Sequence, residues 1–166
     1  MSLELVPARA DDLEFIYEAE RRPGFEAHVG RWARDRHAAA MVDDRHAYFI
    51  ARMIGGRVGF AIIRDWGSPE RVAMVKRVAV ITPGEGIGRT LMTALVDRVF
   101  RETDVWRLWL GHFPENLRAH RAYLACGFVA EGIARGSAYF GGVHRDEQIM
   151  AIVRPDWETR HPALGV

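Results

Sequence analysis

The sequence is short of the features that mark secreted or membrane-spanning proteins. Its 166 residues include one cysteine, Cys126, which excludes an internal disulfide and suits a reducing compartment. No apolar run approaches the roughly 18 residues of a membrane-spanning helix, and "MSLELVPARADD" lacks the charged-then-apolar pattern of a signal sequence, so we expect none. The formal net charge is only +1, which offers no general attraction to nucleic acid or membranes. We therefore expect a cytoplasmic protein that binds neither nucleic acid nor a membrane.

Metal-binding and nucleotide-binding motifs are also missing. The seven histidines show no metal-ligand spacing, and a single cysteine argues against a structural zinc site. The stretch "PGEGIGRTLM", residues 83–92, is rich in glycine but has no lysine, so it is not a P-loop. Arg89 stands where a dinucleotide fingerprint needs its last glycine. The sequence therefore predicts no metal and disfavours a dinucleotide-binding oxidoreductase.

The chain is expected to form one mixed α/β domain over residues 1–166. No repeat, low-complexity tract or linker divides it, and its length suffices to bury a core without disulfides. Alternating apolar patterns predict strands over 3–8, 46–53, 57–66, 71–81, 105–113, 128–134 and 144–153. Helical spacing and capping signals predict helices over 11–20, 28–41, 87–100 and 115–126. Trp32 is the largest candidate core residue of the second helix, and Gly127 should end the last. In the third, an apolar stripe at i+4 spacing is formed by Ile87, Leu91, Leu95 and Val99.

Gly84, Gly86 and Gly88 crowd the junction between a predicted strand and a predicted helix. A tight turn alone would explain one of these glycines. Three of them suggest bare backbone N–H groups at a helix N-terminus, where the helix dipole also favours an anion. The junction is therefore a candidate phosphate site.

This junction resembles the signature Gln/Arg-x-x-Gly-x-Gly/Ala of the GNAT superfamily of N-acetyltransferases. Gly86 and Gly88 fall on its two small positions. Pro83 occupies the first position, where the family usually has Arg or Gln, and Arg89 could supply the positive charge instead. A second block, "PENLRAHRAYLACGF", is similar to the family's Asn-x-x-Ala-x-x-x-Tyr-x-x-x-Gly-Phe segment, matched by Asn116, Ala119, Tyr123, Gly127 and Phe128. The spacing of the blocks and the tail resemble the ribosomal-protein N-terminal (Rim-type) branch.

The resemblance implies an α+β fold with a central, mostly antiparallel, splayed sheet of six to seven strands and about four helices. It implies transfer of an acetyl group from acetyl-CoA to a primary amine of a small molecule or protein N-terminus, by direct attack. No metal is involved. The residues that it assigns to acetyl-CoA are Val78, Ala79, Val80, Glu85, Gly86, Ile87, Gly88, Arg89, Thr90 and Asn116.

Two site residues have a structural reading beside the functional one. The resemblance implies that Tyr123 is the general acid that protonates the departing thiolate. The commoner role of a half-buried tyrosine on an amphipathic helix is packing. Asn116 fits a helix cap as well as a contact with pantetheine or acceptor. The general base stays open between an ordered water and the candidates Glu18, Glu20, Glu26, Glu131 and His112.

The acceptor is also open. A polyamine enzyme is expected to have a concentrated acidic pocket, and the mixed charge of residues 11–44 disfavours one. A non-catalytic acyl-CoA-binding sensor on the same fold is the alternative, and it could dispense with the acid at Tyr123. The sequence leaves the oligomeric state open, a homodimer included.

Overall fold

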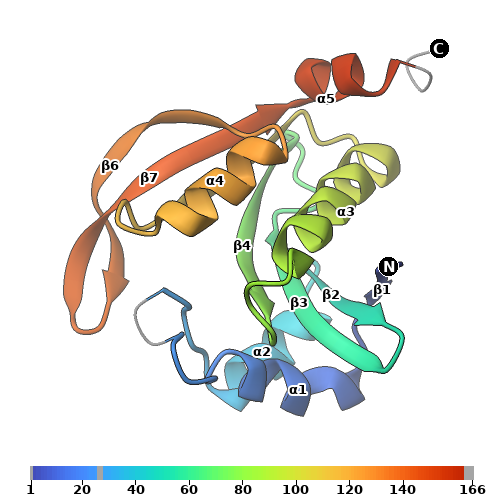
Figure 1. The fold of residues 1–166 in the computed structure, drawn as a ribbon, viewed down its shortest axis with the longest axis vertical. Coiled ribbons are helices and arrows are strands. Elements are labelled where there is room, and N and C mark those ends of the chain that lie inside the picture. Colours follow the sequence, from blue (N-terminus) through green and yellow to red (C-terminus); the bar gives the residue numbers. More distant parts are fainter. Residues whose placement is uncertain (1, 26–27, 163–166) are drawn as a thin grey trace.

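The structure, a computed structural model, describes residues 2–25 and 28–162. It contains a seven-stranded sheet and five α-helices, with a short 3-10 helix, Ala10–Asp12, before the first (Figure 1). The strands are β1 (Glu4–Pro7), β2 (His46–Met53), β3 (Gly56–Arg64), β4 (Val72–Val80), β5 (Arg107–His112), β6 (Val129–Phe140) and β7 (Val143–Val153). The helices are α1 (Leu13–Ala19), α2 (Arg34–Val42), α3 (Ile87–Glu102), α4 (Leu117–Ala125) and α5 (Arg154–Arg160).

The strand order in the sheet is β1-β2-β3-β4-β5-β7-β6. All neighbouring strands are antiparallel except β4 and β5, which run parallel. Parallel neighbours need a crossover connection, and α3 supplies it here. The predicted mixed fold with a mostly antiparallel sheet is confirmed.

The sheet splays between β4 and β5. The two strands share only three residue pairs, the last of which is Met74 with Trp109. Beyond it, β4 continues along β3 up to Val80, whereas β5 continues along β7 up to His112. Each strand then has a partner on its outer side alone, so the predicted opening of the sheet is confirmed.

Two hydrophobic cores pack on opposite faces of the sheet. The first lies under α3 and includes the predicted stripe, because Ile87, Leu91, Leu95 and Val99 are all buried. It also takes in residues next to α4 and in α5. The second lies under α1 and α2 and contains Trp32, which is buried as expected.

Two helices differ from the prediction. The helix expected over 28–41 begins only at Arg34, because the preceding segment is held by tertiary hydrogen bonds: Trp32 N–H donates to Glu20 Oε2 at 3.2 Å, and its carbonyl accepts from Arg21 at 2.9 Å. Helix α5 is additional to the four expected. Trp157 holds it by stacking on Phe100, with ring centroids 5.6 Å apart. No helix in the described part of the chain is long and apolar enough to cross a membrane.

Candidate active site

The glycine turn after β4 leaves the N-terminus of α3 open. Gly84 and Gly86 have φ of +96° and +76°, a left-handed conformation that favours glycine. Gly86 is the N-cap residue of α3 and has no side chain with which to cap it. The N–H groups of Ile87, Gly88 and Arg89 have no acceptor within the described residues, whereas that of Thr90 donates to Gly86 O. These donors and the helix dipole make a site suited to phosphate.

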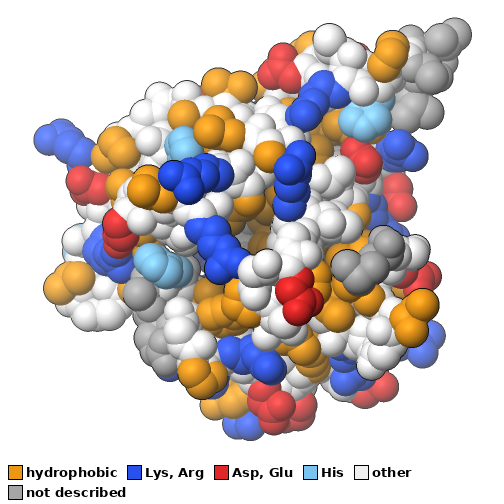
Figure 2. All heavy atoms as spheres, viewed as in Figure 1, with side chains coloured by type: hydrophobic (Ala, Val, Ile, Leu, Met, Phe, Trp, Pro, Cys, Tyr) orange, Lys and Arg blue, Asp and Glu red, His pale blue; other side chains and the backbone are white. Residues whose placement is uncertain are grey.

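Arg118 of α4 lies over this turn. A Cβ built on Gly84 would stand 3.3 Å from Arg118 Nη2, so the guanidinium borders the glycine backbone. Figure 2 shows basic side chains gathered over the region between α4 and α3. The sequence pointed to Arg89 as the cation that replaces the residue lost at Pro83, and it offered no signal for Arg118. Both arginines are exposed, and only the fold brings Arg118 to the turn.

The open side of β4 presents backbone groups of alternate residues. Ile81 N–H donates to Val58 O of the β3 side at 2.8 Å, so the alternation of an antiparallel ladder directs the amide and carbonyl of Ala79 to β3 as well. The same groups of Val78 and Val80 face the opening. The backbone of Ala79 is thus paired within the sheet, and contacts of Val78, Ala79 and Val80 with acetyl-CoA stay predictions.

Tyr123 lies on α4, half-buried against the first core. Its ring centroid is 5.9 Å from that of His112 and 6.0 Å from that of Phe128. The described residues provide no hydrogen-bond partner for its hydroxyl. Burial raises the pKa of Tyr123 to about 12, so the group is protonated at neutral pH and suits a proton donor. Cys126 Sγ, 3.5 Å from Thr93 Oγ1, holds this end of α4 against α3.

His112 ends β5 and lies beside Tyr123. Its Nδ1 is 2.9 Å from the Phe113 carbonyl, which can only accept, so Nδ1 carries the hydrogen. Its Nε2 then accepts from His120 Nδ1 at 3.0 Å. Burial lowers the pKa of His112, and the neighbouring His120 adds to the effect. The neutral form of His112 is therefore favoured where its ring lies beside Tyr123 at the rim of the opening.

Asn116 is the N-cap of α4. Its side-chain oxygen accepts from the backbone N–H of Ala119 at 3.3 Å, which confirms the capping role. A contact with acetyl-CoA stays a prediction. At the other end, Gly127 has φ of +102° and ends the helix as expected.

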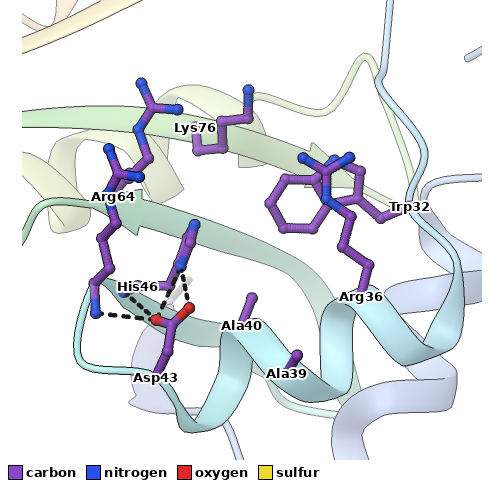
Figure 3. A pocket seen from close by; sticks show the side chains of 9 residues that line it. Trp32, Arg36, Ala39, Ala40, Asp43, His46, Arg64 and Lys76 are labelled. Carbon is purple, nitrogen blue, oxygen red and sulfur yellow. Dashed lines mark hydrogen bonds and ion pairs between the residues drawn. The ribbon is translucent and has the colours of Figure 1, made fainter.

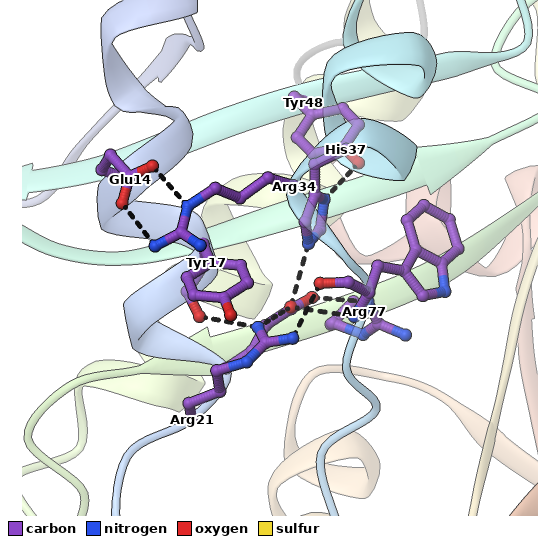
Figure 4. A network of polar contacts seen from close by, with 9 residues as sticks. Glu14, Tyr17, Arg21, Arg34, His37, Tyr48 and Arg77 are labelled. Atoms are coloured by element: carbon purple, nitrogen blue, oxygen red, sulfur yellow. Dashed lines mark hydrogen bonds and ion pairs between the residues drawn. The ribbon is translucent and has the colours of Figure 1, made fainter.

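Glu20 is a structural carboxylate rather than a base. It is fully buried, with Oε1 2.5 Å from Arg77 Nη1 and Oε2 2.9 Å from His37 Nε2 (Figure 4). Burial alone would raise the pKa of Glu20, but the hydrogen bond to His37 and the charge of Arg77 hold it below its usual range.

Among the other base candidates, Glu131 is paired with Arg107 at 2.6 Å on the surface. Glu26 lies outside the described residues, and Glu18 is exposed.

Glu147 of β7 is a carboxylate that the sequence motifs missed. A Cβ on Gly111 of β5 would stand 2.5 Å from Glu147 Oε2, so this side chain covers the strand that borders the opening. Glu147 Oε1 accepts from Ser137 Oγ at 2.9 Å. Gly111 alternates with Leu110 of the first core, so Glu147 lies on the face opposite α3. No group of three His, Cys, Asp or Glu suited to a metal ion occurs in residues 2–25 and 28–162.

Two solved structures that share this architecture are N-acetyltransferases. The spermidine N-acetyltransferase of Vibrio cholerae in complex with CoA and spermine superposes with a TM-score of 0.80, over 93% of this chain and 97% of that one, at 21% identity. The ribosomal-protein-S18-alanine N-acetyltransferase of Escherichia coli gives 0.74, over 92% and 94%, at 24% identity. At these sequence identities the structural similarity establishes the fold alone, and both of these structures are of the N-acetyltransferase class.

The chain belongs to the acetyltransferase (GNAT) family, whose sequence model matches residues 13–128. A probable N-acetyltransferase of Bacillus subtilis (strain 168) is 39% identical over 75 residues. That segment makes up 45% of this chain and 41% of the relative, so the match spans less than half of the curated protein. Enzymes of this family use acetyl-CoA, and the predicted family membership is confirmed.

Proposed function

We propose that the protein transfers the acetyl group of acetyl-CoA to a primary amine by direct attack. The observation that carries the proposal is the opening between β4 and β5, bordered by the uncapped N-terminus of α3 on one side and Tyr123 on the other. These three features lie on elements that the first core holds in place. We also propose that residues 1–166 form a single N-acetyltransferase domain.

The residues around the opening fit acetyl-CoA, which supplies the acetyl group as a thioester. The N–H groups of Ile87, Gly88 and Arg89 are free to donate to phosphate oxygens, and Arg118 adds a cation at the same turn. The free backbone groups of β4 match an amide-bearing arm such as pantetheine. Gly86 leaves open space where a Cβ would stand, so a ligand can approach the backbone.

The side chains divide the proton chemistry between the two faces of the sheet. An alkylamine has a pKa of about 10 and is protonated at neutral pH, so the acceptor must lose a proton before it attacks. Glu147 lies on the face open to the acceptor and accepts that proton directly or through a water molecule. Tyr123, protonated at neutral pH, donates to the departing sulfur. The acceptor is a small-molecule amine or a peptide N-terminus.

A screen of amines and N-terminal peptides with acetyl-CoA, which detects free CoA thiol and the acetylated product, tests the proposal. Transfer to any member of the panel supports it. Saturable acetyl-CoA binding with no transfer to any amine supports the alternative, a non-catalytic acyl-CoA-binding sensor. The hydroxyl of Tyr123 favours the enzyme, since a sensor has no use for a proton donor.

A further inference from the structure

A pocket of about 250 Å³ lies on the α2 side of the sheet (Figure 3). Its walls come from α2, from β2 to β4, and from Trp32. Four cationic side chains line it, Arg36, Arg45, Arg64 and Lys76, with Asp43 at one edge; Arg45 is paired with Asp65. Lys76 is the only lysine in a chain with 22 arginines. The pocket is therefore more basic than the chain as a whole, whose net charge is +1.

The carboxylates nearby are already engaged. Both oxygens of Asp43 lie within 3.0 Å of His46 Nδ1, and Oδ1 also accepts from backbone N–H groups. Asp65 is bound to Arg45 at 2.8 Å and stands 3.8 Å from Arg64 Nε. That Nε is buried and has no hydrogen-bond partner among the described residues. A buried donor without a partner is costly, so it marks a place where an acceptor would be stabilised.

The other two cations have no carboxylate partner in the described part of the chain. The guanidinium of Arg36 stacks over the ring of Trp32 at 4.0 Å, which holds it in position while its N–H groups remain available. Burial lowers the pKa of Lys76, and the charges of Arg64, Arg77 and Arg36 lower it further. Like charges that destabilise one another in this way favour a bound anion.

The pocket adjoins the opening on the acceptor side. Lys76 is the extra residue of a bulge in β4, between the residues that pair with Ile62 and Ile63 of β3, and it comes two residues after the last β4–β5 pair. At about 3.3 Å per residue, Lys76 is about 7 to 13 Å along the strand from Val78 and Val80. Glu147 acts electrostatically on Lys76 and raises its pKa, while its own Oε1 accepts from Ser137 Oγ.

We infer that this pocket binds an anionic group, a carboxylate or a phosphate, on the acceptor itself. The inference rests on the proposed acetyl transfer and names its substrate class: an amine that carries an oxyanion about 7 to 13 Å away. Arg36, Arg64 and Lys76 bind the anion, while the amine end reaches the opening beside Glu147. A polyamine, which is cationic along its whole length, is a poor match for this pocket.

Matched acceptors test the specificity. Aminohexanoate, its uncharged amide and aminohexyl phosphate share a chain that spans the required distance. We expect kcat/KM for at least one of the two anionic acceptors to exceed that for the amide by about tenfold or more, the range of a charge-assisted hydrogen bond. Lys76→Gln and Arg36→Gln should remove most of that advantage, whereas Arg101→Gln, at the far end of α3, should preserve it. Equal losses for the anionic and amide acceptors would overturn the inference.

A second measurement does not depend on transfer. Because Lys76 is the only lysine, an amine-reactive reagent labels one side chain, and peptide mapping separates it from the N-terminus. Inorganic phosphate or succinate should slow the labelling of Lys76 severalfold, and succinamide should not. Protection without turnover of any amine would support the anion site and count against the enzyme. Labelling that neither anion slows would overturn the site even in an active enzyme.

Discussion

Replacement of Tyr123 by Phe separates a catalytic hydroxyl from a packing ring. The ring contacts with His112 and Phe128 survive the substitution. The hydroxyl has no hydrogen-bond partner among the described residues, so the free energy of unfolding should change by less than about 1 kcal/mol. Acetyl-CoA affinity should stay near that of the parent, because the open amides of β4 and the turn before α3 are untouched.

The expected effect on catalysis is much larger. A positioned general acid contributes about 10² to 10⁴ in rate, which corresponds to roughly 3 to 5 kcal/mol of barrier. The thiolate is a better leaving group than an alkoxide, so we expect the lower part of this range in kcat. Since the pKa of Tyr123 is about 12, the parent should retain its acid form throughout the usual assay range.

The assay combines steady-state kinetics with calorimetry on the same preparations. Chemical unfolding reports stability, titration with acetyl-CoA reports binding, and release of free thiol reports kcat. Tyr139→Phe is the matched control, because Tyr139 is 71% exposed on the β6–β7 hairpin. A Tyr123→Phe protein that binds acetyl-CoA normally and turns over within about threefold of the parent would refute the acid role.

Three further predictions follow from the turn and the histidine pair. Gly86→Val should abolish most of the stabilisation of about 2.7 kcal/mol that acetyl-CoA provides at 100 times Kd, and Gly142→Val, at φ +82° in equally open space, controls for backbone strain. An undiminished thermal shift would contradict the phosphate site. Arg118→Ala should raise Kd for acetyl-CoA about tenfold by calorimetry, and a loss no greater than that of Arg101→Ala would argue against it. The pKa of His112 is lowered from its unfolded value of about 6.5, so the free energy of unfolding should fall as pH drops below about 6.5. His112→Gln should flatten that slope in urea titrations, and an unchanged slope would exclude His112 as its source.

Local sequence patterns predicted the features that depend on near neighbours. Spacing alone placed the buried stripe of α3, since residues four apart share one face of a helix. The Asn116 cap and the Gly127 stop lie within a few residues of the backbone groups that they serve. The resemblance to a known family, rather than composition or periodicity, predicted the splayed sheet and the class of reaction.

The sequence by itself determined most of the strands and helices and the glycine turn, because each is encoded in residues close together along the chain, and its two spaced motifs carried the resemblance that gave the acetyltransferase class. Only the tertiary structure decided which side chains meet. It placed Arg118 over Gly84, buried Glu20 against Arg77, and brought Glu147 to the strand that borders the opening. These contacts join residues 30 or more positions apart. They depend on strand register and helix packing, in which a shift of one residue turns a side chain to the other face of the sheet.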